Sequence, residues 1–168
     1  MNLLAFVILI VGVASRIFTH LPNFTPVVAL ALFGGAYLKK EQAVIVPLLL
    51  MIISDCVIGF HDTFLFTWGS VAAVALLGLH LRERKSAGSV LVYSLSSAVL
   101  FFIVTNFGAW PALYPHTAAG LLECYVAAIP FFRYTLISTL VYSIIFFGAY
   151  EGIAARVKET SLARIWLS

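Results

Sequence analysis

The chain has 168 residues, of which 62% are hydrophobic and only 10% are charged, and its formal net charge is +3. Its mean hydropathy of +1.07 excludes an ordinary soluble domain, because too few polar residues exist to cover a soluble globule of this size. No basic run is long enough to indicate nucleic-acid binding. The composition therefore predicts a single integral membrane domain over residues 1–168, in contact with the lipid bilayer.

Six apolar stretches follow one another along the chain. The predicted spans are residues 2–18, 25–38, 43–60, 64–81, 88–108 and 130–155. A helix needs about 20 apolar residues to cross the hydrocarbon of a bilayer, so six such helices with short connections account for nearly the whole chain. We therefore expect an all-α integral membrane protein, a compact bundle of six transmembrane helices.

The positive charges between the spans predict the orientation of the bundle. They form three clusters, Lys39/Lys40, Arg82/Arg84/Lys85 and Arg156/Lys158/Arg164. All three fall at one face of a six-span arrangement, and lysine and arginine gather on the cytoplasmic side of membrane proteins. We expect both termini in the cytoplasm and a multi-pass location in a bacterial-type inner (cytoplasmic) membrane. Arg16 and Arg133 fall near the outer face, where a cation in or beside an apolar span is costly unless it is paired.

The outer connections carry polar, aromatic and proline residues. The connection between spans one and two contains Pro22 and Pro26, which are expected to end one helix and start the next. The longest connection covers residues 110–129. Its second half is amphipathic, and this pattern predicts a short separate segment at the membrane interface, in the outer loop between helices five and six.

Asp55 is the strongest candidate for a functional residue. It lies about five residues before the outer end of span three, roughly 8 Å below the surface at 1.5 Å per residue. A carboxylate at that depth needs a partner, and Arg16 and Arg133 reach similar depths. Two interpretations stay open: an ion pair that only holds helices together, and a polar group of a binding site.

Other polar and aromatic side chains converge on the same outer level. The predicted substrate-binding residues are Asn23, Thr25, Asp55, His61, Trp68, Asn106, Trp110, Tyr114 and Arg133. Aromatic walls with a few placed polar groups are the usual form of a small-molecule site, and the Asn106 amide can both donate and accept hydrogen bonds. Each aromatic residue taken alone is equally explained by the interfacial aromatic belt of membrane proteins.

Small residues in span two predict close helix packing. Ala31 and Gly35 are four residues apart and lie on one helix face, where another helix can approach. The sequence leaves open whether that helix belongs to this bundle or to a separate membrane protein. No nucleophile elbow, zinc-protease motif or P-loop occurs, so neither enzymatic activity nor a cofactor is expected.

Five short motifs carry a resemblance to a known family. They are Arg16 followed by 20–26, the run 29–36 ending in Gly-Gly-Ala, Ser54-Asp55 with 59–61, the run 105–110, and 130–133. With them the chain resembles the small six-helix substrate-binding (S) components of energy-coupling-factor (ECF) vitamin transporters, in particular an uncharacterised or solitary branch. The resemblance implies a water-soluble micronutrient bound near the outer face, a lid of outer loops, and docking on a transmembrane coupling subunit driven by two ATPases.

The resemblance has two qualifications. S components typically dock through an Ala-x-x-x-Ala pattern in the first helix, and Ala31 with Gly35 in span two is only an approximate substitute. A cobalamin-uptake branch works without that docking and binds cobalt through a cysteine. Cys56 would fill this role here.

The leading hypothesis is therefore a membrane-embedded protein that binds and takes up a small water-soluble micronutrient. One alternative is a solitary cobalamin or corrinoid transporter with Cys56 as cobalt ligand. Another is a polytopic membrane enzyme that uses Asp55, His61 and His116 on a lipid-like substrate. A third is a structural membrane subunit, whose outer end would be filled by side chains and hold no cavity.

Overall fold

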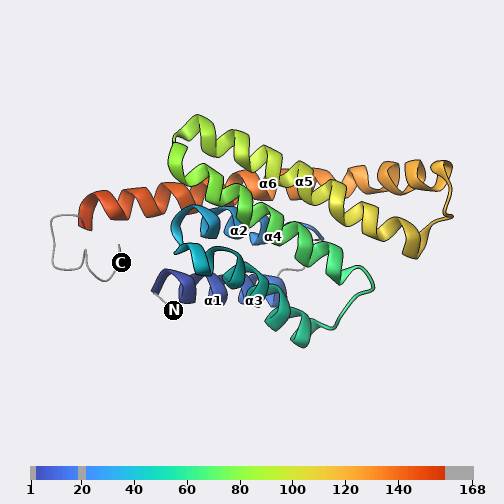
Figure 1. The fold of residues 1–168 in the computed structure, drawn as a ribbon, viewed down its shortest axis with the longest axis horizontal. Helices are drawn as coiled ribbons and strands as arrows, with labels where there is room; N and C mark the ends of the chain where they lie inside the picture. The colour runs from blue at the N-terminus through green and yellow to red at the C-terminus, as the bar shows by residue number, and fades with distance from the viewer. Residues whose placement is uncertain (1–2, 19–21, 158–168) are drawn as a thin grey trace.

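A computed structural model describes residues 3–18 and 22–157, and its described elements are all helices (Figure 1). They are α1 (Leu3–Phe18), α2 (Val27–Tyr37), α3 (Lys40–Ile58), α4 (Phe64–Leu81), α5 (Ala87–Leu113) and α6 (Ala118–Val157), with a 3₁₀ turn η1 (Arg82–Arg84) after α4. The predicted all-α class and the six helices are confirmed. Of the residues used above, residues 20 and 21 of the first motif, Lys158 and Arg164 lie outside the described ranges.

Four of the helices are long and apolar enough to cross a membrane. They are α3, α4 with its 3₁₀ extension, α5 and α6, whereas α1 and α2 are shorter apolar helices. Large apolar side chains cover the outside of the bundle, among them Phe6, Ile45, Leu76, Leu91, Ile103 and Ile144. A soluble protein rarely exposes so much apolar surface, so length and surface together suggest a membrane protein.

The short helix α2 is the centre of the bundle. All of its residues except Tyr37 are buried, and it contacts each of the other five helices. Its apolar residues show no preferred face, which is the pattern of a helix buried on every side. With 11 residues it spans about 16 Å, less than the hydrocarbon thickness of about 30 Å.

The basic side chains gather at one end of the bundle. The starts of α1, α3 and α5 and the ends of α2, α4 and α6 lie there, on the left of Figure 1. We call it the basic end, and it carries Lys39, Lys40, Arg82, Arg84, Lys85 and Arg156. Arg82 donates to the carbonyl oxygens of Gly35, at 2.9 Å, and of Leu38, so it satisfies the end of α2.

The predicted short segment between helices five and six does not form a separate element. Residues 118–129 are the first part of α6, which continues through Pro130 to a total of 40 residues, or about 60 Å (Figure 1). Thr117 accepts a hydrogen bond from the Gly120 amide at 3.1 Å, and Tyr125 donates to the Ile103 carbonyl at 2.7 Å. The start of α6 is therefore held against α5. Pro130 does not end α6, because a single proline removes only one hydrogen bond of the helix.

Candidate functional site

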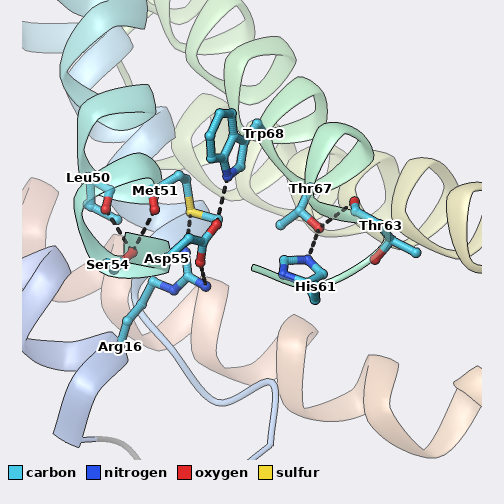
Figure 2. Close-up of polar contacts among 9 residues, drawn as sticks. All are labelled: Arg16, Leu50, Met51, Ser54, Asp55, His61, Thr63, Thr67 and Trp68. Carbon is cyan, nitrogen blue, oxygen red and sulfur yellow. Dashed lines mark hydrogen bonds and ion pairs between the residues drawn. The ribbon is translucent and has the colours of Figure 1, made fainter. Parts of the chain in front are cut away.

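A buried ion pair lies at the end of the bundle opposite the basic end. Asp55 of α3 is fully buried, and its Oδ1 is 2.6 Å from Nη2 of Arg16 of α1. Its Oδ2 accepts a hydrogen bond of 2.7 Å from the indole nitrogen of Trp68 of α4 (Figure 2). The carboxylate thus joins three helices, and the arginine that pairs with it is Arg16 and not Arg133.

The end of α3 fixes the position of this carboxylate. Ser54 donates to the carbonyl oxygens of Leu50 and Met51 (Figure 2). Gly59, with φ of +107°, ends the helix through a hydrogen bond from its backbone N–H to the Asp55 carbonyl. That φ favours glycine, since other residues are strained there. Nη1 of Arg16 also lies 3.0 Å from the Met51 sulfur, so α3 holds both terminal nitrogens of the guanidinium.

A cavity of about 340 Å³ adjoins this ion pair, and we call it the site cavity. Residues from all six helices and from two connections contribute to its wall. They are Arg16, Asn23, Thr25, Val27, Val28, Met51, His61, Thr67, Phe101, Phe102, Thr105, Asn106, Ala128, Phe131, Phe132, Thr135 and Ser138. Among the residues that the structure describes, the wall contains one permanent cation and one histidine and no carboxylate.

Four phenylalanines form the aromatic part of the wall. Phe101 and Phe102 come from α5, and Phe131 and Phe132 come from α6. The rings of Phe102 and Phe132 are 4.6 Å apart between centroids, so the two helices meet at this wall. Aromatic rings offer large flat surfaces for a planar guest, and they hold it without losing much side-chain freedom.

Hydroxyl and amide groups supply the polar part of the wall. The Asn106 side chain donates a hydrogen bond of 2.7 Å to the Phe102 carbonyl. The amide oxygen of Asn106 can therefore accept a hydrogen bond from a bound molecule. Thr105 donates to the Phe101 carbonyl at 2.8 Å, and Ser138 donates to the Thr135 carbonyl at 3.1 Å. These hydroxyl oxygens keep their accepting capacity, so the wall can both donate to and accept from a guest.

The two connections that border the cavity are attached in different ways. Asn23 has φ of 60° and its carbonyl accepts from Ser138 at 3.4 Å, so the connection between α1 and α2 is held on α6. In the other connection, Nε2 of His61 lies 3.1 Å from the Thr67 hydroxyl, which also reaches the Thr63 carbonyl (Figure 2). If that hydroxyl donates to Thr63, the histidine donates to it, which assigns the ring hydrogen to Nε2.

The structure divides the predicted site residues into three groups. Asn23, Thr25, His61 and Asn106 line the cavity. Asp55 and Trp68 do not line it and reach it only through Arg16. Trp110, Tyr114 and Arg133 are not part of the wall either: Trp110 donates to the Pro115 carbonyl at 2.8 Å, and Arg133 donates to the Tyr134 hydroxyl at 3.0 Å.

Several wall residues were not among the predicted site residues. They are Arg16, Val27, Val28, Met51, Thr67, Thr105, Ala128, Thr135, Ser138 and the four phenylalanines. A signal for four of them exists in the sequence, because Arg16, Thr105, Phe131 and Phe132 lie in the motifs described above, and Arg16 is also one of the two cations predicted near the outer face. The remaining ones look like ordinary residues of an apolar helix.

Cys56, the predicted cobalt ligand, is exposed on the outside of α3 and does not line the cavity. Within residues 3–18 and 22–157, no group of three histidine, cysteine or acidic side chains lies close enough to hold a metal ion.

The small residues of α2 pack inside the bundle. Ala31 is fully buried, and a Cβ added to Gly35 would lie 2.1 Å from the Ala75 carbonyl oxygen of α4. A Cβ added to the facing Gly78 would lie 2.2 Å from the Leu32 carbonyl oxygen. Of the two partners left open by the sequence, the structure provides the helix of the same bundle. A separate membrane protein therefore has no access to Ala31 and Gly35 in this structure.

The comparisons with known proteins define a family and no function. A family model described as a family of unknown function, DUF6580, matches residues 1–161, so the chain belongs to this family. No match was found among the curated proteins or among the solved structures.

Proposed function

We propose that this protein is a membrane-embedded binding and uptake protein for a small water-soluble nutrient, captured in the site cavity. The observation that carries the proposal is the cavity itself, since a wall with four aromatic rings and convergent amide, hydroxyl and guanidinium groups is the usual form of a small-molecule site. A structural subunit would instead fill this end of the bundle with side chains.

In this proposal the six helices together form the transmembrane domain, with α2 enclosed by the others. The basic end lies in the cytoplasm, by the distribution of lysine and arginine, and the site cavity lies near the outer face. The connections that carry Asn23, Thr25 and His61 border the cavity and would act as its lid. The resemblance of the sequence to the S components of ECF transporters agrees with this arrangement.

The wall supports a compact, polar, ring-containing ligand. A volume of about 340 Å³ is near the lower end of the range for small-molecule sites. The Arg16 guanidinium has five N–H donors, which is more than its contacts to Asp55 and Met51 require. Because Asp55 balances the charge of Arg16, the arginine can donate hydrogen bonds to a ligand that is not an anion. The position of Cys56 and the small volume give no support to a corrinoid.

Coupling to an ATPase module has no support from Ala31 and Gly35, because α4 already occupies the face that they form. A coupling subunit would have to dock elsewhere on the bundle. The proposal therefore favours uptake without that docking site.

Native mass spectrometry of gently extracted protein tests the binding proposal. We expect wild-type protein to carry an additional small mass, and Thr105→Phe to lose it, because Thr105 lines the cavity and the larger ring fills part of it. Ile103→Phe is the matched control, since Ile103 is on the same helix with an exposed side chain. Asn106→Ala should weaken retention of the same mass. Equal bound masses in wild type, Thr105→Phe and Ile103→Phe would contradict the proposal.

A further inference from the structure

A second cavity, of about 590 Å³, lies between α5 and α6 toward the basic end. Its apolar wall includes Val90, Leu140 and Phe147, and the cavity is open to the outer surface of the bundle at Leu91 and Ile144. Its polar mouth is made of Tyr37, Lys85, Ser86 and Glu151, where the tyrosine hydroxyl donates to the glutamate and the Lys85 amine lies 4.1 Å from the centre of the tyrosine ring. The mouth is therefore at the end opposite the site cavity.

Four buried hydroxyl groups, in the wall of the second cavity or between the two cavities, have no hydrogen-bond partner among the described residues. They belong to Ser94 and Ser97 of α5 and to Thr139 and Ser143 of α6. Each of these residues is at most 1% exposed. In other helices of the same bundle, buried serine hydroxyls donate to a carbonyl of the preceding turn, as Ser54 and Ser70 do. Hydroxyls buried without a partner are costly, so a partner that the structure does not contain is indicated.

The spacing of these hydroxyls makes them continuous with both cavities. On α5, Ser94 and Ser97 are followed by Phe101, four residues later, so the three side chains share one helix face. Ser94 lines the second cavity and Phe101 lines the site cavity. Ser97 therefore lies between the two cavities on this helix.

On α6 a second row of hydroxyls lies between the two cavities. Thr135, Thr139 and Ser143 are spaced by four residues and share a face. Thr135 lines the site cavity and Ser143 lines the second cavity, so Thr139 lies in the partition between the two cavities on this helix. At 1.5 Å per residue, Thr135 and Ser143 are about 12 Å apart along the axis.

We propose that the substrate leaves the site cavity between α5 and α6, passing Ser97 and Thr139 into the second cavity and leaving at the mouth formed by Tyr37, Lys85 and Glu151. This route rests on the proposed uptake function. The four hydroxyls, which have no hydrogen-bond partner among the described residues, then act as hydrogen-bond partners of the passing solute or of the water that accompanies it. Because the partition offers hydroxyls and no charge, it suits a hydrogen-bonding solute without net charge.

Cysteine labelling tests the route without knowledge of the substrate. Single cysteines replace Ser94, Ser97, Thr139 and Ser143 in the full chain, with Cys56 and Cys124 changed to alanine, and the probe is the uncharged reagent 2-hydroxyethyl methanethiosulfonate. The thiolate is the reacting form, and it is generated where water reaches the thiol. Val99→Cys and Ile137→Cys are the matched controls, since both positions are exposed on the outside of the same helices, two residues from the partition.

We expect cysteines at all four positions to react at least about tenfold faster than the two controls. The route is wrong if cysteines at 97 and 139 react no faster than the controls, even where those at 94 and 143 do, because the second cavity is then closed toward the site. Ser97 and Thr139 probe the partition from different helices, so one poorly folding variant leaves the other to decide. Since no substrate is used, failure of the route is distinguishable from failure of the binding proposal.

Discussion

At the scale of single residues, the contacts of Asp55 explain why a charge is tolerated inside an apolar bundle. The carboxylate is fully buried, and it is matched by the Arg16 guanidinium and by the Trp68 indole N–H. These contacts agree with both interpretations of Asp55, as a structural ion pair and as part of a binding site. The pair joins helices, and its arginine is also part of the cavity wall.

This arrangement predicts strong coupling between the two charges. Asp55→Leu leaves Arg16 inside the protein without its counter-charge, and we expect a loss of about 3–5 kcal/mol in the free energy of unfolding. The Arg16→Leu/Asp55→Leu double variant removes both charges and should lose less than the two single variants together. Denaturation of the purified proteins in detergent measures the three losses. Additive losses would contradict a coupled pair.

At the scale of elements, the crossing of α2 and α4 determines how the bundle closes. Gly35 and Gly78 bring the two backbones into contact, and a Cβ on either residue would lie within 2.2 Å of a carbonyl oxygen of the other helix. The obstacle is backbone, which cannot move aside as a flexible side chain can. Since α2 is enclosed by the other helices, an opening of this crossing would disturb the whole interior.

Gly78→Ala is therefore expected to destabilise the protein by about 1–3 kcal/mol or more through overpacking. Gly69→Ala is the control on the same helix, since a Cβ added there meets nothing within 4 Å, and it should be neutral or slightly stabilising. Thermal unfolding of both variants in the same detergent gives the comparison. A Gly78→Ala protein as stable as Gly69→Ala would show that the crossing can relax.

At the scale of the whole molecule, the two cavities lie toward opposite ends of the α5 and α6 pair. These two helices pack along each other and contribute residues to both walls. The other helices form a compact unit around α2, which contains most of the buried apolar core.

The orientation of the molecule in the membrane follows from its charge distribution and is a prediction about the whole chain. With Cys56 and Cys124 changed to alanine, a cysteine replacing Lys85 should be labelled by a membrane-impermeant maleimide only after the membrane is opened. A cysteine replacing Tyr114, in the connection between α5 and α6 at the other end, should be labelled on intact cells. The reverse pattern would invert the bundle and place the site cavity at the cytoplasmic face.

The sequence by itself determined the all-α class, the order of the six helices, the approximate bounds of the first five, and the gathering of basic residues at one end. These features follow from hydropathy and charge, which are properties of local composition. It also indicated that Asn23, Thr25, His61 and Asn106 lie at one level of the bundle, because their positions relative to the helix ends can be counted.

Only the tertiary structure decided which side chains meet. Whether Arg16 or Arg133 pairs with Asp55, whether Trp110 and Tyr114 reach the cavity, and which helix covers Gly35 all depend on helix rotation and on the neighbours of each helix. An apolar helix surrounded by apolar material has no amphipathic pattern that fixes its rotation. The joining of residues 118–129 to α6 was likewise decided by contacts with α5, since the local pattern favoured a separate segment.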